Sequence, residues 1–154
     1  MLREYDGKTF TNICADNLDL GTEDEKKALE SENEAAKDLL DTLKDSLDGA
    51  VSAVRFTNKL QTYAVCLTSE GALSLEMEKA LNQMPNAQGM KAQLVLEINH
   101  AHPVAEKLKA LFAADDKETL KKYAKLLYAQ GCLISGKSID DPAELSALIC
   151  ELMK

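Results

Sequence analysis

The first third of the chain has apolar residues at helical spacing, framed by signals for a helix start and a helix end. Thr22 and Glu25 form a capping box, and Asp48-Gly49 is a typical stop. Between them, apolar residues recur every three or four positions: Leu29, Ala36, Leu39, Leu40, Leu43 and Leu47. The pattern predicts one helix over residues 23–48, and we interpret residues 1–22 as an extended connector that precedes it.

The middle of the chain alternates between strand-like and helical patterns. Three short runs are predicted as strands: residues 51–57, 63–68 and 93–98. The second run is apolar on both faces, so we expect it at the centre of the sheet. Residues 73–84 and residues 103–113, the latter with Pro103 at the first position, are predicted as helices. Residues 49–113 therefore form an α/β part.

From residue 115 onward the pattern is helical. Asp115 with Glu118 predicts a helix start, Gly136 ends that helix, and Asp141-Pro142 begins the last one. The apolar positions of the two helices are Leu120, Tyr123, Leu126, Leu127, Leu133 and Ile134, then Leu145, Leu148, Ile149, Leu152 and Met153. Such wide apolar faces are either core or interface. Pairing two copies into a four-helix bundle would cover the excess.

Length and composition are those of one folded domain. A chain of 154 residues is long enough for one domain and too short for two comfortable ones. Its 45% apolar and 29% charged residues are ordinary for a globular protein. We therefore predict a single α+β domain over residues 1–154, in which a small sheet of about three strands packs with helices. Residues 115–154 are its helical C-terminal third.

The acidic character of the chain is confined to its front. Residues 1–48 hold 6 basic and 14 acidic side chains, whereas residues 49–154 hold 12 of each. Since no basic cluster is interleaved with aromatic residues, we expect no nucleic acid as a partner. No apolar run approaches the roughly 18 residues of a membrane span, and the start lacks the apolar region of a secretion signal. We expect a cytoplasmic protein without a membrane partner.

Residues that could carry chemistry are few. Of the four cysteines, Cys66, Cys132 and Cys150 lie in apolar runs, where reduced and buried thiols are expected. No G-x-S-x-G nucleophile motif and no G-x-x-x-x-G-K phosphate loop occurs. We therefore expect no catalytic residue, no cofactor-binding residue and no metal ligand.

The two histidines leave an alternative open. His100 and His102, with Glu97 nearby, could hold a metal ion if a further ligand joined them. The structural interpretation is that His102 is the N-cap of the following helix and that Asn99 fastens the turn. A small metal-binding protein therefore stays as the alternative to a chain without a metal.

Methionine is concentrated in one short segment. Met77, Met84 and Met90 fall within 14 residues. On a helix, Leu73, Met77, Leu81 and Met84 would form one stripe. Such a stripe is either core or a surface for partners, because methionine adapts to varied surfaces.

Six segments occur in an order that a known chaperone family shares. They are Y-D-G-K-T-F at 5–10, V-S-A-V-R-F-T-N-K-L at 51–60, T-S-E at 68–70, S-L-E-M-E-K at 74–79, L-E-I-N-H-A-H-P-V at 96–104 and S-I-D-D-P at 138–142. Together they resemble the C-terminal domain of the ninety-kilodalton heat-shock chaperones, in the bacterial, HtpG-type form. The chain departs from that pattern at His100 and at Tyr63 or Ala64, where the family usually has Pro.

The resemblance implies a chaperone module of the stress response that is not itself an enzyme. ATP and magnesium would bind in the parent protein's N-terminal domain, which this chain lacks, so the chain is expected to be an excised piece. Its expected partners are a second copy of itself and unfolded or partly folded client proteins. A free-standing monomeric adaptor is the alternative.

The resemblance also assigns residues to the two expected surfaces. The homodimer would form through the last two long helices, with the interface residues Leu120, Leu127, Ile134, Leu145, Leu148, Ile149, Leu152 and Met153. Clients would contact the Met-bearing helix, with the binding residues Leu73, Leu75, Met77, Leu81 and Met84.

Overall fold

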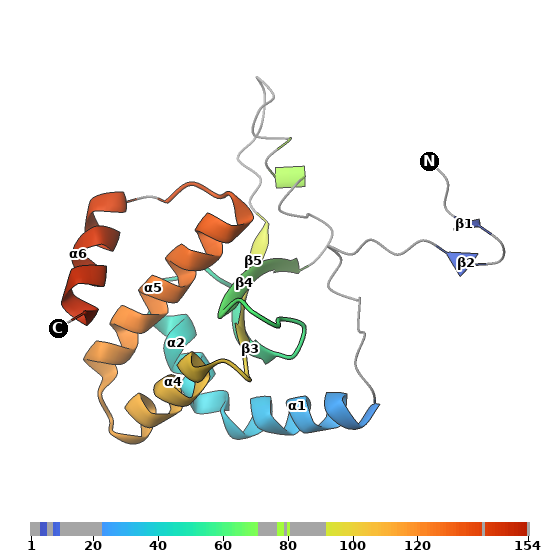
Figure 1. Cartoon of the computed structure of the whole chain (residues 1–154), viewed down its shortest axis with the longest axis horizontal. Coiled ribbons are helices and arrows are strands. Elements are labelled where there is room, and N and C mark those ends of the chain that lie inside the picture. Colours follow the sequence, from blue (N-terminus) through green and yellow to red (C-terminus); the bar gives the residue numbers. More distant parts are fainter. Residues whose placement is uncertain are drawn as a thin grey trace.

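The computed structural model describes residues 4–5, 8–9, 23–70, 77–78, 80, 92–139 and 141–153. In chain order its elements are β1 (Glu4–Tyr5), β2 (Lys8–Thr9), α1 (Glu23–Ala35), α2 (Lys37–Asp45), β3 (Ala53–Thr57), β4 (Val65–Glu70), β5 (Gln93–Asn99), α4 (Pro103–Ala113), α5 (Lys117–Ser135) and α6 (Pro142–Leu152). Figure 1 shows a small sheet flanked by helices. The prediction of an α+β fold is confirmed. β1 and β2 form a separate antiparallel pair.

The sheet has the strand order β3-β5-β4, with β5 parallel to β3 and antiparallel to β4. The prediction that residues 63–68 form the central strand is therefore wrong, because β4 is at an edge and β5 is in the middle. Every residue of β5 after Gln93 is buried. Both faces of β5 are buried, and one of them carries the charged residue Glu97. Because a central strand is expected to be apolar on both faces, Glu97 made β5 look unlike one in the sequence.

The predicted single helix over residues 23–48 is also corrected, because it is two helices that meet at Ala36. Asn33, near the end of α1, donates to the carbonyl oxygen of Phe56 at 3.2 Å and accepts from the N–H of Phe56 at 2.8 Å. Its side-chain amide thus pairs with β3 as a neighbouring strand would. The leucines of α2 pack beneath the sheet instead, so the two helices serve different contacts.

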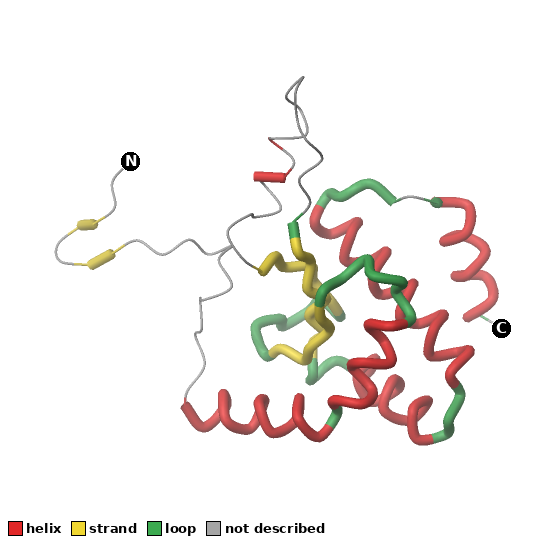
Figure 2. The backbone as a smooth tube through the Cα atoms, turned by 180° about the vertical axis from the view of Figure 1, so that it is seen from behind, coloured by secondary structure: helices red, strands yellow, loops and turns green. Residues whose placement is uncertain are grey.

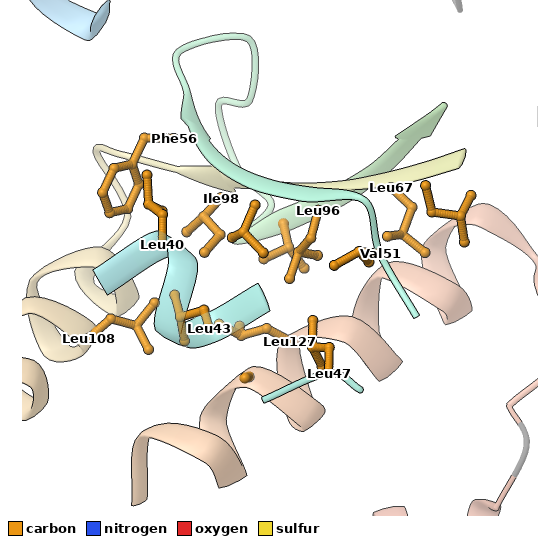
Figure 3. Packing of buried hydrophobic residues seen from close by; sticks show 14 of the residues in the cluster. Leu40, Leu43, Leu47, Val51, Phe56, Leu67, Leu96, Ile98, Leu108 and Leu127 are labelled. Carbon is orange, nitrogen blue, oxygen red and sulfur yellow. The ribbon is translucent and has the colours of Figure 1, made fainter. Parts of the chain in front are cut away.

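The core lies between one face of the sheet and the helices α2, α4 and α5. Figure 3 shows Leu40 and Leu43 of α2 between the sheet residues above them and the helices below. Gly131 of α5 allows close packing on β4, since a Cβ at this position would lie 2.9 Å from Cγ of Leu67. Seen from behind in Figure 2, as in Figure 1, α6 lies at the margin of the molecule, and it packs against α5.

The turn around the histidines is fastened as predicted. The N–H of Val104 donates to Nδ1 of His102 at 3.2 Å, so His102 is the N-cap of α4. Oδ1 of Asn99 accepts from the N–H of Ala101 at 3.0 Å, and its Nδ2 donates to the carbonyl oxygen of Tyr63 at 3.1 Å. Asn99 therefore joins the end of β5 to the loop that precedes β4.

The boundaries of the last two helices agree with the sequence except at one residue. The N-cap of α5 is Asp116 rather than Asp115, because Oδ1 of Asp116 accepts from the N–H of Thr119 at 3.1 Å. This bond lowers the pKa of Asp116. Gly136 ends α5 in the left-handed conformation that glycine favours, with φ of 65°. Asp141 caps α6 as predicted, accepting from two backbone N–H groups at 2.9 Å.

Candidate functional site

The residues predicted at the dimer interface fall into two groups. Leu120 and Leu127 are almost completely buried in the core of the single chain. Their assignment to the interface is corrected, because a side chain enclosed by its own chain has no surface to offer a second copy. The other six lie on the surface or are partly covered: Ile134, Leu145, Leu148, Ile149, Leu152 and Met153.

Exposed apolar residues occur both at the C-terminal end of α5 and on α6. No residue of α6 is buried. Its Ile149 is 40% exposed, and on α5 Leu133 and Ile134 are 61% and 49% exposed. Leu133 was not among the predicted interface residues, although it belongs to the same apolar run. We call these exposed residues of α5 and α6, together with Met153, the α5–α6 surface.

Two ion pairs connect α6 to α5. Nζ of Lys125 lies 2.7 Å from a carboxylate oxygen of Glu144, and Nζ of Lys122 lies 3.2 Å from one of Glu151. The hydrogen bond that Lys125 donates to Glu144 raises the pKa of Lys125. One pair lies near each end of α6, and since both are partly exposed each contributes little to stability.

An open cavity of about 200 Å³ lies beside this contact. Its lining comes from three places in the chain: the end of α2 with the loop after it, the outer side of α5, and α6 with the segment before it. Tyr128, Ile139, Leu145 and Leu148 contribute apolar side chains. The space explains why Leu145 and Leu148 are only partly covered although they face the body of the chain.

Of the predicted client-binding residues, Met77 is the one that the structure describes. Leu73, Leu75, Leu81 and Met84 lie outside the described residues. Met77 is helical, and its side chain is 52% exposed. The next residue, Glu78, is buried.

A polar row crosses the face of the sheet opposite the core. Arg55 of β3, Glu97 of β5 and Cys66 of β4 stand side by side in the strand register. Nε of Arg55 donates to Glu97 at 2.9 Å, and Sγ of Cys66 donates to its other oxygen at 3.6 Å. Burial, followed by the charge of Glu97, raises the pKa of the Cys66 thiol to about 12. A thiol held in its protonated form is a poor nucleophile.

The comparisons with known proteins cover the whole chain. Residues 1–154 match the family described as Hsp90 protein. The chain belongs to the Hsp90 family. It is 44% identical over 154 residues to the chaperone protein HtpG of Clostridium acetobutylicum and to that of Clostridium perfringens. It is 42% identical over 153 residues to the HtpG of Shouchella clausii.

These relatives are much longer than the chain. The matches take in 100% of the chain for the two Clostridium proteins and 99% for the Shouchella protein, but only 24% of each relative. The Hsp90-family chain thus corresponds to about a quarter of an HtpG protein.

In this Hsp90-family chain the two histidines have separate partners, which differs from the shared metal site considered from the sequence. Nδ1 of His102 caps α4, and Nδ1 of His100 lies 3.3 Å from a carboxylate oxygen of Glu32 on α1. Glu97 is bonded to Arg55 and Cys66. Among the described residues no three His, Cys, Asp or Glu side chains come together as metal ligands. The proximity of the two histidines in sequence therefore does not produce a shared site with Glu97.

Two further sequence predictions can be compared with the structure. Cys132 is buried as expected and Cys66 is partly buried, but Cys150 is exposed on α6, so the prediction of a buried thiol is wrong for Cys150. Among the described elements α6 packs mainly against α5, which leaves Cys150 uncovered. In the described part of the chain, no helix has both the length and the apolar content needed to cross a membrane.

Proposed function

We propose that the chain is the C-terminal self-association module of a bacterial Hsp90-family chaperone, and that two copies pair through the α5–α6 surface. The observation that carries this is that α6 buries no residue within its own chain. An isolated helix of about 11 residues is marginal in water, so its apolar side chains need a further layer. A second copy supplies one by symmetry, because the same surface is used twice.

The pairing we propose is a four-helix bundle made of α5 and α6 from each copy. In such a bundle the outward side of α5 near Leu133 and Ile134 meets the apolar side of α6. The ion pairs to Glu144 and Glu151 lie between α5 and α6 of one chain, so they leave the apolar side of α6 available. Leu120 and Leu127 support α5 from inside the chain.

The client-binding role is proposed for the segment that carries Met77. An exposed methionine in a helical turn suits a surface that accepts varied unfolded chains. We assign ATP binding and hydrolysis to parts of the parent chaperone outside this chain, and no catalytic role to this chain. We also propose that the chain takes part in chaperone activity, as the name of its HtpG relatives suggests.

Sedimentation equilibrium at tens of micromolar tests the pairing. We expect twice the mass of one chain for the wild type. Ile149→Glu should shift the chain to a monomer, because a carboxylate would be buried without a partner. A wild-type chain that sediments as a monomer would contradict the proposal and favour the monomeric adaptor.

Ala147→Glu is the matched control for this experiment. Ala147 is two residues from Ile149 on α6, so it lies on the opposite side of the helix. It lines an open hollow in which three lysines and three glutamates of α5 and α6 mix, so a new carboxylate stays in a solvated, charged setting. This variant should remain a dimer. If both variants dissociate equally, the pairing surface is not the Ile149 side of α6.

A further inference from the structure

Glu78 is a buried carboxylate with partners from two separate parts of the fold. One of its oxygens, Oε2, accepts from the N–H of Ala92, just before β5, at 2.9 Å. The other, Oε1, lies 3.7 Å from Nζ of Lys137, directly after α5. Only 10% of the Glu78 side chain is exposed. No feature of the proposed function uses this residue.

The burial of Glu78 has a consequence for its neighbour Met77. A buried carboxylate without partners is costly, so the helical turn is most stable where Ala92 and Lys137 can reach it. Successive residues of a helix point about 100° apart, so with Glu78 turned inward Met77 points to one side of it. Met77 and Ala80 are both exposed.

Lys137 reaches Glu78 from a rigid point of the backbone. Its N–H donates to the carbonyl oxygen of Cys132 at 2.8 Å, in the bonded turn that ends α5 at Gly136. The exposed Leu133 and Ile134 belong to the last turn of the same helix. Figure 1 shows the short helical piece at residues 77–78 on the same side of the sheet as this end of α5. Lys137 thus connects the Met77 turn to the α5–α6 surface.

We propose that Glu78 is a positioning residue, which ties the Met77 turn to Ala92 and to Lys137 and so presents Met77 to clients beside the end of α5. The inference rests on the proposed client-binding function. It adds a contact between the client segment and the self-association surface. The ion pair to Lys137 makes this contact, while the hydrogen bond from Ala92 fixes Glu78 to the start of β5.

Two substitutions separate the charge from the hydrogen bond. Lys137→Met removes the ammonium but keeps side-chain length, and Glu78→Gln removes the charge but keeps an oxygen that can accept from Ala92. Lys137→Arg restores the charge and serves as the rescue variant. Lys117→Met is the matched control, because Lys117 forms an exposed ion pair with Asp115 at 3.2 Å.

The rate of amide hydrogen exchange at Ala92 measures how firmly the Ala92 N–H is bonded to Glu78. The affinity of the whole chain for a labelled, carboxymethylated unfolded polypeptide measures client binding. Lys137→Met and Glu78→Gln should each accelerate the exchange and weaken the binding by about threefold. Glu78→Ala should accelerate the exchange by about tenfold or more, because it leaves the Ala92 N–H unpaired. Lys137→Arg and Lys117→Met should behave as the wild type does.

The outcomes separate this inference from the proposed function. If Met77→Ser weakens binding but Lys137→Met and Glu78→Gln change neither readout, the anchor is overturned and client binding stands. If exchange accelerates while binding is unchanged, Glu78 is only structural and the inference falls. If the wild type binds no unfolded polypeptide, the client-binding proposal fails and this inference fails with it, whatever the exchange of Ala92 shows.

Discussion

The helices α5 and α6 follow each other along the chain, and α6 is the more apolar of the two by sequence. Yet α5 supplies Leu120, Ala124, Leu127 and Cys132 to the core, whereas α6 buries no residue. α5 packs against both β4 and α6, whereas among the described elements the main contact of α6 is with α5. The apolar content of a helix therefore does not predict whether the helix is buried in the single chain. The position of the helix in the layers decides it.

The sharpest test of this difference compares a core residue with a residue of α6. On α5, Leu127→Ala should lower the free energy of unfolding by ~2–5 kcal/mol, because it opens a cavity in an enclosed site. Ile149→Ala should cost about 1 kcal/mol or less at the lowest usable protein concentration, where pairing contributes least. Urea denaturation monitored by circular dichroism measures both. Equal losses would mean that α6 is part of the core of the single chain.

The two N-caps provide the next comparison. Asp116→Ala should lower the free energy of unfolding of the whole chain, since the N-cap it removes belongs to α5, which is part of the core. Asp141→Ala should leave global unfolding nearly unchanged, while amide exchange at Ala143 and Glu144 accelerates, because α6 frays at its start. If Asp141→Ala destabilised the whole chain as much as Asp116→Ala, the two helices would unfold as one unit.

The pKa of Asp116 adds a pH dependence to this comparison. The bond from Thr119 lowers that pKa below its ordinary value of 3.8. The contribution to stability is therefore present above about pH 4 and is lost as the pH falls through the lowered value. Acid titration of the unfolding midpoint should show a smaller loss in Asp116→Ala than in the wild type.

The smallest effects are expected from the thiols, and they are best measured in a Cys14→Ser background. At pH 8 and low protein concentration, Cys150 should react with a disulfide reagent within minutes, whereas Cys132 should react only on unfolding. Cys66 should also be slow, since with a pKa of about 12 only about one thiol in ten thousand is ionised at this pH. Rapid labelling of Cys132 would contradict the core assignment of α5.

The raised pKa of Cys66 also makes the stability of the folded chain depend on pH in the alkaline range. In the unfolded chain the thiol ionises near its ordinary value of 9.0, whereas in the folded chain it keeps its proton up to about 12. Stability is therefore complete below about pH 9 and declines as the pH rises between these values. Cys66→Ala should reduce this decline, as measured by urea denaturation at pH 8 and pH 10.

Local signals in the sequence predicted the helix ends well. The N-caps His102 and Asp141 and the terminal Gly136 act on backbone groups within a few residues, so their effect does not depend on the rest of the fold. The prediction missed by one residue at Asp116, where two adjacent aspartates compete for the same role. It missed the break at Ala36, because that break serves a contact of Asn33 with a distant strand.

The candidate site was predicted in part. The residues of α6 and Ile134 were correctly placed in an apolar run, and their role in pairing stays a prediction. Leu120 and Leu127 belong to the same helical pattern but are buried in the core of the single chain, and periodicity alone cannot tell a core side from an exposed side. Glu78 and Lys137 carry no shared local signal, since 59 positions separate them in the chain.

Short-range chemistry thus set most of the helices and strands of this protein, because caps, glycine stops and apolar spacing act over a few bonds. The strand order, the exposure of α6 and the contact between Glu78 and Lys137 depend on which segments meet in space. β5 became the central strand by pairing with strands that precede it by tens of residues. α6 is exposed because α5 packs against the sheet with one side and leaves α6 to pack on its outer side. A second copy of the chain is our proposal for what covers it.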